Sequence, residues 1–104
     1  MEPMVYIKIH EERGERIVAI CDEELLDKKL VDAKLGIVFH VNREFYGGSL
    51  VPLSMAIEEA KNATILNIVG EKIVSAAIRN ELIHPDAVIR IAGVPHAQAI
   101  RMIW

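Results

Sequence analysis

Two short glycine-containing strings hold most of the side chains that could do chemistry. The first is FYGGSLVP at residues 45–52, and the second is GVPHAQ at residues 93–98. His96 in the second string is a candidate general acid or base, because an imidazole titrates near neutral pH. Arg90 precedes it and could stabilise an anion. If the two strings line one cleft, with Tyr46 or the glycines shaping it, they predict a small enzyme.

The glycines of the first string lie between an apolar run and an expected helix, where backbone N–H groups can meet an anion. The chain has no GxxxxGK[ST] loop and no GxGxxG fingerprint. Pro52 also removes one N–H donor from the start of the helix. We therefore expect Gly47 and Gly48 to form a turn that needs a positive φ, rather than an anion site.

The same strings favour a second function, a small binding or adaptor module for RNA, the ribosome or another information-processing protein. Tyr46, Arg43 and Arg90 are residue types that hold single-stranded nucleic acid. We expect Phe45 to anchor its loop in the core and Tyr46 to be displayed. The candidate binding residues are Asn42, Arg43, Tyr46, Gly47, Gly48, Asn67, Arg90, Gly93, His96 and Gln98.

The C-terminal segment AIRMIW at residues 99–104 suggests a third function, a structural homo-oligomer, because it is apolar and tryptophan is favoured at interfaces. We favour the binding module over the enzyme, since the chain shows no Ser-His-Asp order, GxSxG elbow or paired-carboxylate spacing. The net charge of −3 argues against broad phosphate neutralisation, although it allows a local basic patch.

Cysteine and histidine content argues against disulfide and metal chemistry. The single cysteine, Cys21, cannot form an internal disulfide, and we expect a buried thiol. The four histidines show no metal-ligand spacing, so we expect no metal and no cofactor. The N-terminus does not resemble a signal peptide, and no apolar run approaches the roughly 20 residues of a membrane span. We expect a cytoplasmic protein that does not contact membranes.

The elements that would position these side chains begin with a hairpin. Apolar residues alternate at positions 5–10 and run continuously at positions 16–21, which predicts two strands. Gly14 supplies the positive φ that the connecting loop needs. Because the second strand is the more apolar, we expect it to be central in the sheet.

A short helix and a third strand follow in the sequence. The acidic residues 22–24 favour a helix start, and three leucines between residues 25 and 30 extend it. LGIVFHV at residues 35–41 is a predicted strand with Ile37 and Phe39 on one face. Residues 42–49 are a predicted loop, and Pro52 is suited to the first turn of the next helix.

Residues 63–83 (ATILNIVGEKIVSAAIRNELI) allow two interpretations. One is a buried strand, a break at Gly70 and a helix from Glu71. The other is one long helix capped by Thr64, with Gly70 inside it. We favour the first, because an interior glycine costs about 1 kcal/mol relative to alanine and the surrounding β-branched residues disfavour a helix.

The last part of the chain adds a turn at residues 84–87, a strand at residues 88–92 and a C-terminal stretch that fits a helix or a strand. This order of elements lacks a regular alternation of strands and helices. It predicts an α+β fold, a two-layer sandwich whose mixed or mostly antiparallel sheet has helices packed on one face. We expect one domain over residues 1–104.

Five strings together resemble the DUF424 family, an uncharacterised archaeal family. They are YIKIH, IVAICDEELL, FYGGSLV, ATILNIVGE and VIRIAGVPHAQ, and they extend over nearly the whole chain. The resemblance implies a two-layer α/β sandwich and an archaeal, cytoplasmic origin. It assigns no activity, substrate or catalytic residue, so it leaves the function open. VPLSMA departs from the polar helix start expected after the glycines, which weakens an anion site there.

Two polar residues within these strings need partners. Asn67 lies in an apolar segment and should bond to the backbone if it is buried, since an unpaired buried amide costs about 1–3 kcal/mol. Arg90 lies on a strand of valine and isoleucine and must reach either solvent or a partner.

Overall fold

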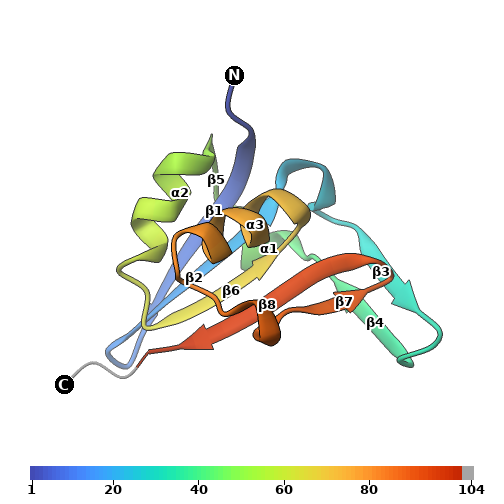
Figure 1. Ribbon diagram of the computed structural model, residues 1–104. Coiled ribbons are helices and arrows are strands. Elements are labelled where there is room, and N and C mark those ends of the chain that lie inside the picture. The colour runs from blue at the N-terminus through green and yellow to red at the C-terminus, as the bar shows by residue number, and fades with distance from the viewer. Residues whose placement is uncertain (102–104) are drawn as a thin grey trace.

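A six-stranded sheet forms the centre of the computed structural model, which describes residues 1–101 (Figure 1). Neighbouring strands are antiparallel except β2 and β6, which are parallel. The sheet is therefore mostly antiparallel, as predicted. In sheet order its strands are β5 (Ser49–Pro52), β1 (Met4–Glu12), β2 (Glu15–Asp22), β6 (Ile65–Val69), β8 (Val94–Ile100) and β7 (Ile89–Ile91).

β1 and β2 form the predicted hairpin. The turn residues Arg13 and Gly14 have φ angles of 50° and 81°, and Glu12 pairs directly with Glu15. This is the geometry of a two-residue turn with positive φ at both positions, whose twist matches that of the strands. β2 lies between β1 and β6 in the sheet, so the prediction that it is central is confirmed.

Two helices, α2 (Leu53–Ala60) and α3 (Glu71–Arg79), cover one face of the sheet (Figure 1). Residues 63–83 contain β6, then Gly70, then α3, so the favoured interpretation is confirmed. Pro52 ends β5, and the helix begins one residue later than expected. Aliphatic side chains from both helices pack on β1, β2 and β6 to form the first core. The predicted α+β fold is confirmed.

A separate hairpin and the short helix α1 (Arg43–Tyr46) cover part of the opposite face of the sheet. The hairpin consists of β3 (Lys29–Asp32) and β4 (Ile37–His40). The helix expected through residue 30 is wrong. A single 3₁₀ turn, η1 (Glu23–Leu25), forms instead, because the chain turns at Asp27 with a φ of 72° and then extends into β3.

β4 confirms the predicted strand type, but its partner is β3 rather than a strand of the main sheet. Leu30 pairs with Phe39, and both pack into a second core that contains Ala19, Cys21 and Val41. The predicted loop at residues 42–49 contains α1, and β5 begins at its end.

The C-terminal stretch, whose sequence fits either a helix or a strand, forms a strand. A short 3₁₀ turn, η2 (Pro85–Ala87), precedes β7, and β8 pairs with both β7 and β6. Ala92 and Gly93 join β7 to β8 with φ angles of 51° and 81°. Trp104 and half of the proposed oligomer segment, residues 102–104, lie outside the described residues.

The start of α3 is capped by a residue from another element. Asp22, at the end of β2, is buried, and its carboxylate accepts the N–H groups of Lys72 and Ile73 over 2.9 and 3.0 Å. Burial raises the pKa of the Asp22 carboxyl, and the two N–H groups act in the opposite direction. Gly70 precedes the helix with a φ of 125°, and a Cβ there would lie 2.2 Å from the Asp22 carboxyl carbon.

Gly70→Ala should destabilise the protein more than Gly93→Ala, because both positions have a positive φ but only Gly70 also contacts Asp22. We expect a loss of about 3 kcal/mol in the free energy of unfolding for Gly70→Ala, from backbone strain and a displaced cap. Gly93, with no atom within 4 Å of a Cβ, should lose about 1 kcal/mol. Urea unfolding of both variants measures this, and equal losses would contradict it.

Candidate functional site

Most of the predicted binding residues gather on the sheet face opposite α2 and α3. His96 and Gln98 lie on β8, and Asn67 on β6 is the direct pairing partner of Gln98. Phe39 of the hairpin lies near both His96 and Tyr46, with ring centroids 4.7 and 6.5 Å apart. The FYGG and GVPHAQ strings therefore meet in space through Phe39, a residue that the sequence analysis did not single out.

Tyr46 is an interior residue that joins α1 to the sheet. It is 2% exposed, and its hydroxyl donates to Asn67 Oδ1 over 2.5 Å. Burial raises the pKa of the phenol. Phe45 instead lies half-buried, stacked on His10 with centroids 5.0 Å apart. The expectation that Tyr46 is displayed is wrong, because consecutive helical residues point about 100° apart and α1 turns Tyr46 inward. Asn67 bonds to this side chain, not to the expected backbone.

Gly47 and Gly48 allow close packing rather than a positive φ. Neither has a positive φ, so that expectation is wrong. A Cβ on Gly48 would lie 2.1 Å from the carbonyl oxygen of Ile7, and one on Gly47 would lie 2.6 Å from that of Arg43. Their N–H groups already donate within the loop, to the carbonyls of Arg43 and Tyr46. These N–H groups are therefore not free to hold an anion.

Asn42 and Arg43 hold α1 against the neighbouring segments. Asn42 Oδ1 accepts the N–H of Phe45 over 2.8 Å and caps the helix. Arg43 forms an exposed ion pair with Asp27 over 2.5 Å, and this hydrogen bond raises the pKa of its guanidinium. Both residues thus have structural partners within the chain.

His96 is buried and has a fixed partner. Its Nδ1 lies 2.8 Å from the carbonyl oxygen of Ile68, so Nδ1 carries the proton in the neutral ring and Nε2 is the free acceptor. Burial lowers the pKa of His96, with the Ile68 bond acting in the opposite direction. A shallow pocket of about 300 Å³ borders the ring, with Ile89 and Gln98 among its lining residues.

Arg90 does not share a cleft with His96. It pairs with Pro95 across β7 and β8, and neighbouring strand residues point to opposite faces of a sheet, so Arg90 lies on the α3 side. Its Nη1 donates to Glu71 Oε1 over 2.8 Å and to the Gly93 carbonyl over 2.9 Å. The expected cleft that holds both His96 and Arg90 is therefore wrong, and the enzyme hypothesis loses its anion stabiliser.

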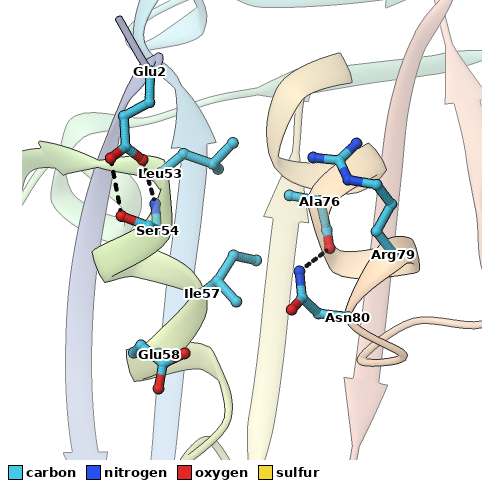
Figure 2. Close-up of a pocket in the computed structure, with 8 residues that line it drawn as sticks. All are labelled: Glu2, Leu53, Ser54, Ile57, Glu58, Ala76, Arg79 and Asn80. Atoms are coloured by element: carbon cyan, nitrogen blue, oxygen red, sulfur yellow. Dashed lines mark hydrogen bonds between the residues drawn. The ribbon is translucent and has the colours of Figure 1, made fainter.

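A groove of about 300 Å³ lies between α2 and α3 (Figure 2). Its floor is formed by apolar side chains such as Ile57 and Ala76, and Arg79 lies at the α3 rim. Glu2 closes the α2 side by accepting the N–H and hydroxyl of Ser54 over 2.8 and 3.0 Å. This groove was not predicted from the sequence, since periodicity gives the apolar stripe of each helix but not the gap between the two helices.

The outer face of the β3–β4 hairpin exposes apolar side chains. We define this outer face as Lys29, Val31, Val38 and His40 on the strands, with Lys34 and Leu35 at the turn. Val31 and Val38 are direct cross-strand partners and are 63% and 65% exposed, and Leu35 is 53% exposed. Lys29 pairs with His40 on the same face. This surface was not predicted from the sequence, although Ile37 and Phe39 were expected to share one face of the strand.

The hairpin is anchored to the rest of the protein. Its inner face packs Leu30 and Phe39 into the second core. Asp32 ties its tip to the turn between β7 and β8, because its carboxylate accepts the N–H of Ala92 over 2.7 Å and that of Leu35 over 3.0 Å. These two bonds lower the pKa of Asp32. The exposed valines are therefore presented on a fixed platform.

The described part of the chain offers little for metal or thiol chemistry. Over residues 1–101, no three His, Cys, Asp or Glu side chains lie close enough together to hold a metal ion. Cys21 is buried, as expected, and burial followed by the charge of Asp22 raises the pKa of its thiol to about 12. Among these residues no helix is long and apolar enough to cross a bilayer.

Together, these elements define a mixed α+β protein with two helices on one face of its sheet and an anchored hairpin on the other. The chain belongs to the family described as "Protein of unknown function (DUF424)", whose model matches residues 10–102. The family resemblance seen in the sequence is therefore confirmed.

A solved structure shares this fold. It is the crystal structure of an uncharacterized conserved protein from the archaeon Methanopyrus kandleri, with a TM-score of 0.80 and 26% sequence identity. The match covers 97% of this chain and 96% of that chain. None of the curated proteins matches the sequence.

Tyr46→Phe should lower the free energy of unfolding by about 1–3 kcal/mol, because it leaves a half-buried Asn67 oxygen without its donor. Tyr6→Phe is the matched control, since the Tyr6 hydroxyl has no hydrogen-bond partner among residues 1–101. We expect the control to change stability by less than about 0.5 kcal/mol. Urea unfolding of the two variants measures this difference. Similar losses of stability in both would show that the Tyr46 hydrogen bond contributes nothing.

The protein should lose stability as the pH falls below the ordinary His96 pKa of 6.5. Above that pH the His96 imidazole is neutral in both the folded and the unfolded protein. Below it the unfolded state binds the proton first, because burial lowers the folded-state pKa, so unfolding becomes easier until the folded pKa is reached.

His96→Gln should reduce the stability difference between pH 7.5 and pH 5, as measured by urea unfolding. His40→Gln, at an exposed position, should leave the difference unchanged. An equal pH dependence in wild type and His96→Gln would contradict the assignment.

Proposed function

We propose that the protein is a cytoplasmic binding module that contacts another protein through the outer face of the β3–β4 hairpin. The observation that carries this proposal is the exposed cross-strand pair Val31 and Val38, with Leu35 beside it. Exposed aliphatic side chains that adjoin one another on a rigid element are typical of an interaction surface. A single free, buried thiol at Cys21 supports a reducing compartment.

RNA and the ribosome were the other partners suggested by the sequence, and the contacts favour a protein over RNA. Stacking on single-stranded RNA needs exposed aromatic rings. Tyr46 is buried and Phe45 is stacked on His10, so neither ring is freely presented. The outer face of the hairpin carries aliphatic side chains instead, and the net charge of −3 gives no broad attraction to phosphate.

The enzyme alternative has weaker support than the binding module. Its proposed acid or base, His96, is held against the Ile68 carbonyl, and its proposed anion stabiliser, Arg90, lies across the sheet with Glu71. Catalysis by this pair would need both side chains to reach one substrate.

A Val31→Thr plus Val38→Thr variant tests the proposal, because it keeps the shape and strand propensity of both positions and makes them polar. Tagged wild type and variant are used to capture partners from nuclease-treated extract of the source organism, with quantification by mass spectrometry. We expect a captured protein whose recovery falls about tenfold or more with the variant, as for the loss of buried interface contacts. Its binding is then measured with purified components.

Met55→Gln is the matched control, since Met55 is 54% exposed on α2, on the other side of the sheet. It should leave the capture unchanged. A protein that is captured from untreated extract but not from nuclease-treated extract would favour RNA as the partner. Equal capture by wild type and the valine variant would overturn the proposed surface.

A further inference from the structure

We infer that the occupant of the outer face is an extended, acidic segment of the partner protein, which pairs with the free edge of β4 as a third strand. This inference rests on the proposed function and adds the chemistry and conformation of the segment that binds.

One edge of β4 has no strand partner in the described part of the chain. Over residues 1–101, β3 and β4 pair with each other alone, and the backbone hydrogen bonds of Ile37–His40 go to β3. Every second N–H and C=O of such a strand points away from its partner, which offers a template for another strand. β3 is the less accessible of the two, because Asp32 ties it to Ala92 near β7.

The outer face of the hairpin carries basic side chains. Lys29, Lys34 and His40 lie on the outer face, and neither lysine contacts a carboxylate within ion-pair distance in the described part of the chain. The nearby carboxylates are engaged elsewhere, since Asp27 pairs with Arg43 and Asp32 accepts backbone N–H groups. A positively charged face with aliphatic side chains is complementary to a segment that mixes acidic and apolar residues.

The geometry of a sheet predicts the pattern of that segment. A residue directly opposite Val38 would have its Cβ about 5 Å away, and a residue two positions along would lie opposite His40. The first should therefore be apolar, to contact Val38, and the second should be acidic. The backbone of the acidic residue would lie two strand spacings, or roughly 10 Å, from the backbone of Lys29. This distance is within reach of two long side chains. The expected segment alternates acidic and β-branched residues on the face that it shares with the valines.

A second copy of this chain is a poorer occupant of the edge. Two β4 strands placed side by side would join two hairpins into one sheet, whose outer face would carry Lys29, Lys34 and His40 of both copies. Such a pairing brings two faces of the same charge sign together and lacks the charge complementarity that an acidic segment supplies.

A display selection from random octapeptides tests the inference on the full-length protein. Enriched peptides are synthesised with a fluorescein label, and their affinities are measured by fluorescence polarisation. We expect acidic peptides whose affinity falls about tenfold or more when sodium chloride is raised from 0.05 to 1 M, because salt screens exposed charges. The same selection on Lys29→Glu plus Lys34→Glu should enrich basic peptides. Lys61→Glu at the C-cap of α2 plus Arg79→Glu on α3, an equal charge change on the other side of the sheet, should still enrich acidic ones.

N-methylation of single peptide nitrogens tests the strand pairing. Because alternate N–H groups of an added strand bond to β4, methylation should abolish binding at every second position and leave it nearly unchanged at the positions between. Hydrogen exchange measured by NMR should show slower exchange at alternate amides of β4 in the complex. A methylation pattern without a period of two would overturn the strand addition.

The outcomes separate this inference from the proposed function. Peptides that bind the outer face without acidic bias, or without the two-residue pattern, would overturn the inference and leave the protein-binding surface standing. Failure to enrich any peptide relative to the Val31→Thr plus Val38→Thr variant would count against both. A self-association of the chain that competes with peptide would identify a second copy as the occupant and overturn the inference.

Discussion

The arrangement of both faces of the sheet depends on one contact, that of the Asp22 carboxylate with the N-terminus of α3. It satisfies two N–H groups that the first turn of a helix leaves without partners, and the missing Cβ of Gly70 makes room for it. This fixes where α3 begins above the sheet. Asp22 also ends β2 and precedes η1, so the same residue directs the chain toward the hairpin on the opposite face. A buried carboxylate is tolerated here because the helix end supplies its donors.

The two-residue period of the sheet then separates the molecule into two surfaces. On β8, Pro95 lies toward α3 with Arg90, and His96 lies toward the hairpin with Phe39. The groove of Figure 2 and the outer face of the hairpin therefore lie on opposite sides of the sheet. The side chains of the GVPHAQ string are divided between the two faces of the sheet, which is why one string does not make one site.

Local sequence patterns predicted the helices and strands well, but they could not predict the contacts between segments that lie far apart in the chain. Alternation gave β1, β2 and the two faces of β4, and Gly70 marked the break before α3. The acids at residues 22–24 resemble the start of a helix that follows them, and nothing nearby in the sequence shows that Asp22 caps α3 instead. The separation of Arg90 from His96 could have been derived from the sequence. If Ala92 and Gly93 are taken as a two-residue turn, Arg90 pairs with Pro95, and the next residue, His96, then points to the other face of the sheet. Whether Val31 and Val38 are covered depends on tertiary packing, which periodicity does not report.

The parallel pairing of β2 with β6 has a consequence for how the chain folds. β1 and β2 meet through a two-residue turn, but β6 can join β2 only after the long stretch between Asp22 and Ile65 has been closed into a loop. Loop-closure entropy grows with the length of the loop, so this pairing is the entropically demanding step. The hairpin, α1 and α2 all lie inside that loop. The outer face of the hairpin is thus carried on a segment whose two ends are clamped by the central strands of the sheet.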